Sequence, residues 1–135
     1  MRSLPSVSLA LLASLLASQL HAAPVAPQVR SEIDGLLVAL QTSGCEFNRN
    51  GSWYEAPKAK SHLLRKLDYL ENRNAVQTTE QFIQLAATQS SMSGKPYLVK
   101  CGGGAAVESK SWLNTQLKAI RAPGRMVGSA GAIAK

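Results

Sequence analysis

The sequence predicts an α+β fold in which a small antiparallel sheet, made of a hairpin plus one later strand, packs against about four helices. Three observations predict it. Asn50-Gly51 lies between two short strand-like segments, apolar residues recur at helical spacing in four other segments, and Cys45 and Cys101 can link the hairpin to the later strand. One domain is expected over residues 23–121, because the chain shows no internal repeat and no second core-sized segment.

The first helix is predicted over about residues 28–42 and the hairpin follows it. The apolar residues of the helix form one face and Gly44 supplies its stop; these residues are Val29, Ile33, Leu36, Leu37 and Leu40. In the hairpin, residues 45–49 and 52–54 flank Asn50-Gly51, a dipeptide that readily adopts the positive φ angles of a type I′ turn.

Two further helices are predicted next. Pro57 suits a first helical turn, and a helix running to about Asn72 carries one apolar face made of Ala59, Leu63, Leu67 and Leu70. Thr78 and Gln81 form a capping box for a third helix, which ends near Thr88. The apolar positions of this third helix are Phe82, Ile83, Leu85 and Ala86.

The last strand and helix follow a break at residues 90–94. Residues 96–101 are predicted to form a strand, with Pro96 at its start, where no ladder donor is lost. Residues 102–104 are three glycines and predict a turn, although amides ahead of a helix can also hold an anion. The final helix is predicted over about residues 107–121 and is marked by Trp112, Leu113, Leu117 and Ile120.

Residues 1–22 are predicted to be a cleaved signal peptide. Arg2 precedes a leucine-rich core that is too short to span a bilayer, and the small residues up to Ala22 fit signal peptidase, to within one residue. An uncleaved N-terminal helix is the alternative. The expected location is therefore periplasmic or secreted, and no later segment is apolar enough to predict an integral membrane protein.

In an oxidising compartment, Cys45 and Cys101 are expected to form a disulfide, since only one intramolecular pairing exists. Closing a loop of this length stabilises a chain by about 4 kcal/mol in the chain-entropy model. Two buried free thiols are the alternative. No metal site or cofactor is predicted, because only His62 remains after processing and the spacing matches no zinc motif.

The net charge of the chain indicates which classes of partner it could bind. Fifteen Lys and Arg against eight Asp and Glu give a net charge of +7, and residues 122–135 are expected to form a flexible basic tail. Outside the cytoplasm, the natural partners are an anionic envelope component or another periplasmic protein, and nucleic acid is not expected. The alternative is an ordinary solvated surface, because the basic residues lack interleaved aromatic residues.

No catalytic residue is predicted. The chain contains no Gly-x-Ser-x-Gly, His-Glu-x-x-His or Ser-x-x-Lys motif, and no pair of carboxylates stands out for acid–base chemistry. His62 lies beside the apolar face of its helix, with Lys66 one turn later. A histidine in such a place is usually a boundary residue hydrogen-bonded to the backbone.

Four blocks of the sequence, in the same order, resemble the YfeK-like family of small exported proteobacterial proteins. The resemblance covers about residues 30–121 and implies a periplasmic location, but no reaction or ligand, because the family is a domain of unknown function. The blocks are Phe47-x-Arg49-Asn50-Gly51, Ala59-x-x-His62-Leu63-x-x-Lys66, Thr79-Glu80-Gln81-Phe82-Ile83 and Ser90-Ser91-x-Ser93-Gly94-Lys95-Pro96-Tyr97-x-Val99.

The polar positions of these blocks suggest a binding groove between the second helix and residues 90–97. Such a groove would hold an anionic or peptide-like ligand through basic side chains and hydroxyl groups. Its predicted residues are Arg49, His62, Lys66, Ser91, Ser93, Lys95 and Tyr97, with Asn50 and Ser90 beside them. The alternative is that these residues serve turn geometry and packing.

Three classes of function follow. The favoured one is a non-enzymatic exported binding or accessory module, because the domain is small and basic and carries no recognisable nucleophile or metal set. The second is an envelope structural or stress protein that acts through its basic surface. The third is an enzyme with an unfamiliar site around His62.

Overall fold

The structure is a computed structural model that describes residues 24–124 of the chain. The predicted signal peptide at residues 1–22 lies outside the described residues, as do residues 125–135 of the predicted basic tail. Between these limits the chain forms four helices and a four-stranded sheet, which confirms the α+β fold class.

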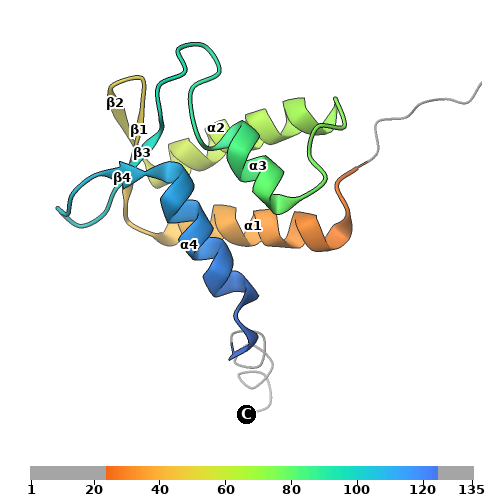
Figure 1. Ribbon diagram of the computed structural model, residues 1–135. Helices are drawn as coiled ribbons and strands as arrows, with labels where there is room; N and C mark the ends of the chain where they lie inside the picture. Colours follow the sequence, from red (N-terminus) through yellow and green to blue (C-terminus); the bar gives the residue numbers. More distant parts are fainter. Residues whose placement is uncertain (1–23, 125–135) are drawn as a thin grey trace, which may run out of the picture.

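The helices are α1 (Pro27–Thr42), α2 (Ala56–Glu71), α3 (Thr79–Ala86) and α4 (Ser109–Arg121). α1 contacts all three of the others, and Figure 1 shows α2, α3 and α4 arranged around it. The predicted apolar faces meet between them, because each helix stabilises itself chiefly by burying such a face. The side chains buried most completely there include Ile33, Leu36, Leu40, Leu67, Phe82 and Leu113.

Two helix starts follow predicted signals, which are Pro57 at α2 and the capping box at α3. Pro residues occupy the first turns of α1 and α2, where a missing N–H costs nothing. At α3 the capping box is present: the Gln81 amide N–H donates to Oγ1 of Thr78 (3.1 Å), and the Thr78 amide N–H donates to Oε1 of Gln81 (3.2 Å). A cap of this kind matters for α3 because the helix has only eight residues.

The sheet contains β1 (Glu46–Arg49), β2 (Ser52–Glu55), β3 (Leu98–Lys100) and β4 (Val107–Glu108), in the order β2-β1-β3-β4, with every pair antiparallel. The predicted turn joins β1 to β2, with φ of 52° at Asn50 and 83° at Gly51. β4 was not predicted. Val107 and Glu108 fall in the range predicted for the last helix, which instead begins at Ser109.

One face of the sheet packs on the ends of the helices. Phe47 of β1 and Val99 of β3 are cross-strand partners and both are buried, and the ring of Trp112 in α4 meets the ring of Phe47 edge-on at 5.8 Å. On the opposite face, the ammonium group of Lys100 lies 4.4 Å from the ring centre of Trp53 and 3.5 Å from a Glu46 carboxylate oxygen. The sheet thus has one apolar and one polar face.

A disulfide joins Cys45 to Cys101, with a Cα–Cα distance of 4.2 Å, and confirms the predicted bridge. Cys45 immediately precedes β1 and Cys101 immediately follows β3, so the bridge closes one end of the β1–β3 ladder. It therefore fixes the later strand beside the hairpin.

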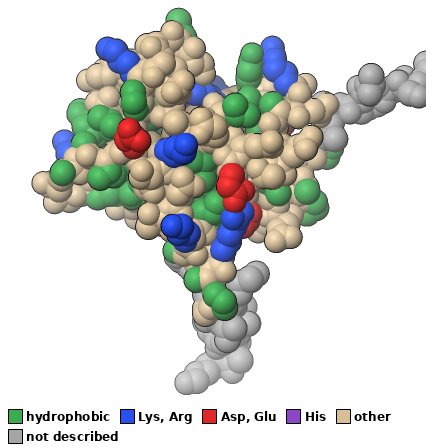
Figure 2. Space-filling view, in the orientation of Figure 1, with side chains coloured by type: hydrophobic (Ala, Val, Ile, Leu, Met, Phe, Trp, Pro, Cys, Tyr) green, Lys and Arg blue, Asp and Glu red, His purple; other side chains and the backbone are tan. Residues whose placement is uncertain are grey.

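Salt bridges link α4 to α1 and to α3 at the C-terminal end of α4. Arg121 forms salt bridges with Glu32 of α1 (Nε–Oε2, 2.6 Å) and with Glu80 of α3 (Nη1–Oε1, 2.5 Å). Figure 2 shows basic and acidic side chains touching on this face of the molecule. Arg121 accordingly lowers the pKa of both carboxyl groups.

In the part of the chain from residue 24 to residue 124, no helix has both the length and the apolar character that crossing a membrane requires.

Candidate functional site

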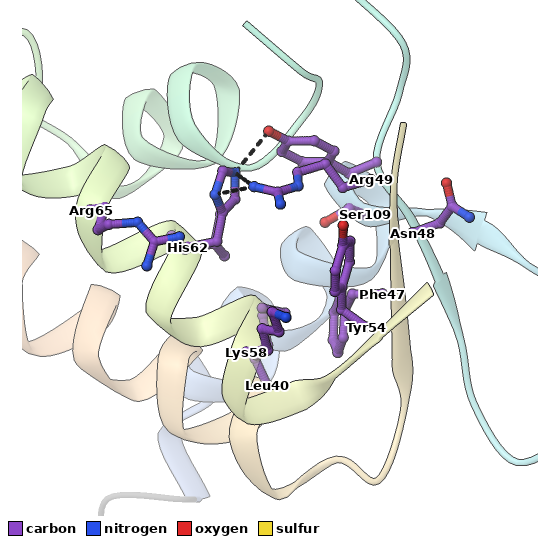
Figure 3. Close-up of a pocket in the computed structure, with 12 residues that line it drawn as sticks. Leu40, Phe47, Asn48, Arg49, Tyr54, Lys58, His62, Arg65 and Ser109 are labelled. Atoms are coloured by element: carbon purple, nitrogen blue, oxygen red, sulfur yellow. Dashed lines mark hydrogen bonds between the residues drawn. The ribbon is translucent and has the colours of Figure 1, made fainter. Parts of the chain in front are cut away.

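Three segments that are separated in the sequence meet at one place. Arg49 is the last residue of β1, His62 and Lys66 lie one turn apart on α2, and Tyr97 precedes β3. α2 begins directly after β2 and packs against both β1 and β2. This packing brings the side chains of α2 close to the end of β1. Figure 3 shows Arg49 from the strands lying against His62 of α2.

Hydrogen bonds fix the backbone of Tyr97 on both sides. The Tyr97 amide N–H donates to the Thr88 carbonyl (3.0 Å), and the Tyr97 carbonyl accepts from the Ser109 amide N–H (2.9 Å). Nearer the hairpin, the Ser93 hydroxyl donates to Oδ1 of Asn50 (2.5 Å). Tyr97 is only 7% exposed, so its position is set by packing as well as by these hydrogen bonds.

A chain of hydrogen bonds links the four polar side chains and has a defined direction. Nη1 of Arg49 lies 2.6 Å from Nδ1 of His62, and Nε2 of His62 lies 3.1 Å from the Tyr97 hydroxyl. Arginine stays protonated in proteins and only donates, so Nδ1 must accept and His62 is neutral. The ring proton is therefore on Nε2, which donates to the Tyr97 oxygen.

The Tyr97 hydroxyl can still donate one hydrogen bond. Its oxygen accepts from Nε2 of His62 and also from the ammonium group of Lys66, at 3.3 Å. With both acceptor positions used, the hydroxyl hydrogen has to point away from His62 and Lys66. A ligand with an acceptor atom at this place would receive it.

The surroundings disfavour charge on these groups. Burial, together with the positive charges of Arg49, Lys66 and Arg65, lowers the pKa of His62 to about 4. Burial and Arg49 also lower the pKa of Lys66, whereas burial raises the pKa of Tyr97. At neutral pH the histidine and the phenol are thus both uncharged, and Arg49 and Lys66 supply the positive charge.

Two adjoining hollows lie around this chain of hydrogen bonds. The first, which we call the wide groove, has a volume of about 400 Å³ and is lined by Arg49, Asn50, Ser52, Tyr54, His62, Lys66, Ser90, Ser91, Met92 and Tyr97. The second, which we call the narrow pocket, has a volume of about 50 Å³ and is lined by Leu40, Phe47, Asn48, Arg49, Tyr54, Lys58, Ala59, His62, Leu63, Arg65, Tyr97 and Ser109. Four residues, Arg49, Tyr54, His62 and Tyr97, line both.

Among the described residues, the basic side chains of these two hollows form no salt bridge with an acidic side chain. No Asp or Glu lines either hollow, and within residues 24–124 none of Arg49, Lys58, Arg65 and Lys66 makes a salt bridge. Arg49 and Lys58 instead lie over the ring of Tyr54, at 5.0 and 5.3 Å from its centre. The uncompensated positive charge suits an anionic ligand.

The predicted groove residues fall into three groups in the structure. Five of them line the wide groove: Arg49, His62, Lys66, Ser91 and Tyr97. Ser93 lies beside the groove and bonds to Asn50. Lys95 is exposed and lines neither hollow, although its backbone carbonyl accepts a hydrogen bond from the Ser90 amide.

Sequence reasoning missed several residues that line the hollows, among them Lys58, Arg65 and Tyr54. Lys58 is four residues before His62 on α2, so helical spacing could have identified it. Arg65 is three residues after His62, so the same spacing could have identified it, whereas no pattern in the sequence signals Tyr54. Within residues 24–124, no three His, Cys, Asp or Glu side chains gather in a way that could hold a metal ion.

The pKa of His62 gives the first prediction. We expect it to remain near 4 in the native protein and to rise toward its ordinary value of 6.5 in Arg49→Gln, since glutamine removes the nearby charge but can still donate to Nδ1. Because the unfolded chain takes up this proton near pH 6.5 and the folded chain only near 4, acidification between these values favours unfolding. An NMR titration of the His62 ring protons measures the shift.

Arg73→Gln is the matched control for this titration. Arg73 also stacks on a tyrosine, with its guanidinium carbon 3.7 Å from the ring centre of Tyr69, but it lines neither hollow. Its removal should leave the pKa of His62 unchanged. A native pKa of 6 or higher would contradict the inferred hydrogen-bond direction.

Comparison with known proteins identifies relatives but no ligand. The family model described as "Family of unknown function (DUF5329)" matches residues 27–121. The protein named "Uncharacterized protein YfeK" from Salmonella typhimurium strain LT2 is 43% identical over 68 residues, which cover 50% of this chain and 55% of that protein. The chain thus spans about half the length of this curated relative. No solved structure matches the chain.

Proposed function

The chain belongs to the DUF5329 family of unknown function, and from this premise we propose that it is an exported, non-enzymatic binding module that holds a small anionic ligand in the wide groove. The observation that carries the proposal is the set of basic side chains around the groove that lack acidic partners. Arg49 and Lys66 face the groove as cations, and the Tyr97 hydroxyl adds a neutral donor.

The site is ready to bind before a ligand arrives. Arg49 is held by His62 and by the ring of Tyr54, and Lys66 is held by the Tyr97 hydroxyl and by the Gln89 carbonyl (3.2 Å). Side chains that are already fixed lose little conformational entropy on binding, so more of the interaction energy appears as affinity. A groove of about 400 Å³ has the size of a typical small-molecule site.

Export is supported by two features. The Cys45–Cys101 disulfide is typical of an oxidising compartment, and residues 1–22 have the composition of a signal peptide. In that compartment the anionic ligand would belong to the cell envelope or to its solutes.

Binding of inorganic phosphate and of acetate tests the proposal. We expect both anions to bind the protein comprising residues 23–135, and Arg49→Gln and Lys66→Met each to weaken binding roughly 10- to 100-fold, because a hydrogen bond to a charged group contributes about 1.5–3 kcal/mol. Isothermal titration calorimetry at fixed ionic strength measures the affinities, and thermal unfolding shows whether each variant is folded.

Matched controls separate a site from general attraction to a basic protein. Arg73→Gln and Lys118→Met remove the same charges from exposed positions that line neither hollow, and they should leave both affinities unchanged. Equal losses in the groove variants and the controls would mean screening by net charge alone, and would refute the proposed site.

A further inference from the structure

The narrow pocket adjoins the wide groove and differs from it in chemistry. One wall is apolar and is made by Leu40, Phe47, Ala59 and Leu63, whereas polar side chains such as Lys58 and Arg65 line the pocket elsewhere. Three of these side chains belong to the buried core, at 0% exposed for Leu40, 7% for Phe47 and 5% for Leu63, so the wall is firmly packed. A small apolar ligand group that fits the existing shape would bury its surface against this wall.

The volume of the pocket limits that group. A cavity needs a volume of roughly 10–15 Å³ to hold one water molecule, and the narrow pocket has a volume of about 50 Å³. This is room for a group between a methyl and an isopropyl in size, but not for an aromatic ring. Ala59 sets part of the limit, since a longer side chain there would occupy the same space.

Polar donors stand at the junction of the two hollows. Arg49 and the Tyr97 hydroxyl line both of them, and Lys66 reaches the same hydroxyl from the wide groove. An anion bound to these donors would lie at the opening of the narrow pocket. A carboxylate carries its carbon substituent directly, whereas a phosphate ester places its carbon beyond a further oxygen, so the carboxylate fits the adjoining apolar wall better.

We infer that the ligand is a carboxylate whose neighbouring carbon bears a small apolar group, with the carboxylate on Arg49, Lys66 and Tyr97 and the apolar group in the narrow pocket; this rests on the proposed function. Two sources share this chemistry. One is a free short-chain acid, and the other is the C-terminus of a peptide that ends in a small residue such as alanine.

A series of carboxylates tests the inference by calorimetry. N-acetylalanine should bind about fourfold more tightly than N-acetylglycine, which is the gain expected from burying one methyl group, and N-acetylphenylalanine at least tenfold more weakly than N-acetylalanine. Propionate and the peptide Gly-Gly-Ala distinguish the sources. Equal affinities point to a free acid and tighter binding of the peptide points to a peptide terminus, and either result supports a carboxylate ligand.

Ala59→Leu fills the pocket and should abolish the preference for alanine over glycine. Ser61→Leu, on an exposed position of the same helix, is its control and should keep the preference. If phosphate and N-acetylglycine bind but alanine gains nothing in the native protein, the inference is overturned and the anion site stands. If no anion binds, the proposed function itself fails. The native series decides even if Ala59→Leu does not fold.

Discussion

We expect removal of the Cys45–Cys101 disulfide to lower the free energy of unfolding by about 4 kcal/mol, the loop-closure entropy of a bridge with a sequence separation of 56. For a domain of about 100 residues, this corresponds to a fall in Tm of roughly 15–30 °C. Urea unfolding of Cys45→Ala/Cys101→Ala, compared with the oxidised native protein, measures the loss.

Reduced native protein is the control for this comparison. Cys45 is only 4% exposed, so its replacement by alanine also removes packed atoms, whereas reduction keeps both sulfur atoms in place. Reduced native protein therefore reports the loss of the bridge alone, and the double variant should unfold at the same or a lower urea concentration. A difference below 1 kcal/mol between oxidised and reduced protein would show that the denatured chain is already compact near these residues.

The disulfide also bears on the candidate site through the register of the sheet. Glu46 pairs with Lys100 and Asn48 with Leu98, so the same register places Arg49 beside Tyr97 at the far end of the ladder. A slip of one residue would turn every side chain of the strand to the other face. The bridge thus fixes, from one end of β1 and β3, the contact that the site needs at the other.

The sequence was sufficient for those parts of the fold that local chemistry determines. Asn50-Gly51 predicted the hairpin because few other dipeptides adopt both positive φ angles readily, and the Thr78–Gln81 capping box placed the start of α3. β4 escaped prediction because two residues are too few to show an alternating pattern, and its pairing with β3 depends on the fold around it.

The site was predictable only in part. The family blocks brought Arg49, His62, Lys66 and Tyr97 to attention, and the structure places these four in one hydrogen-bonded chain. The narrow pocket was not predicted at all. It depends on how the hairpin lies against α2 and α4, and such distances between elements cannot be obtained from spacing along one chain.

We expect Phe82→Ala to destabilise the protein by about 3–5 kcal/mol, the usual cost of emptying a phenylalanine site in a core. Phe82 is completely buried at the centre of α3, a helix of eight residues that is too short to be stable by itself. The same helix leads into residues 88–97, where the Thr88 carbonyl accepts the Tyr97 amide N–H. Phe82→Ala should therefore make residues 88–97, which include Tyr97, more mobile.

Two further variants show whether the burial of Phe82 accounts for the destabilisation by Phe82→Ala. Leu85 lies on the same helix but is 45% exposed, so Leu85→Ala should cost less than about 1 kcal/mol, and Phe82→Leu, which keeps most of the volume, should lie between the two alanine variants. Urea unfolding followed by circular dichroism ranks the three. If Leu85→Ala were as damaging as Phe82→Ala, burial would not explain the loss, since alanine favours the helix at both positions, and the site segment would not depend on Phe82.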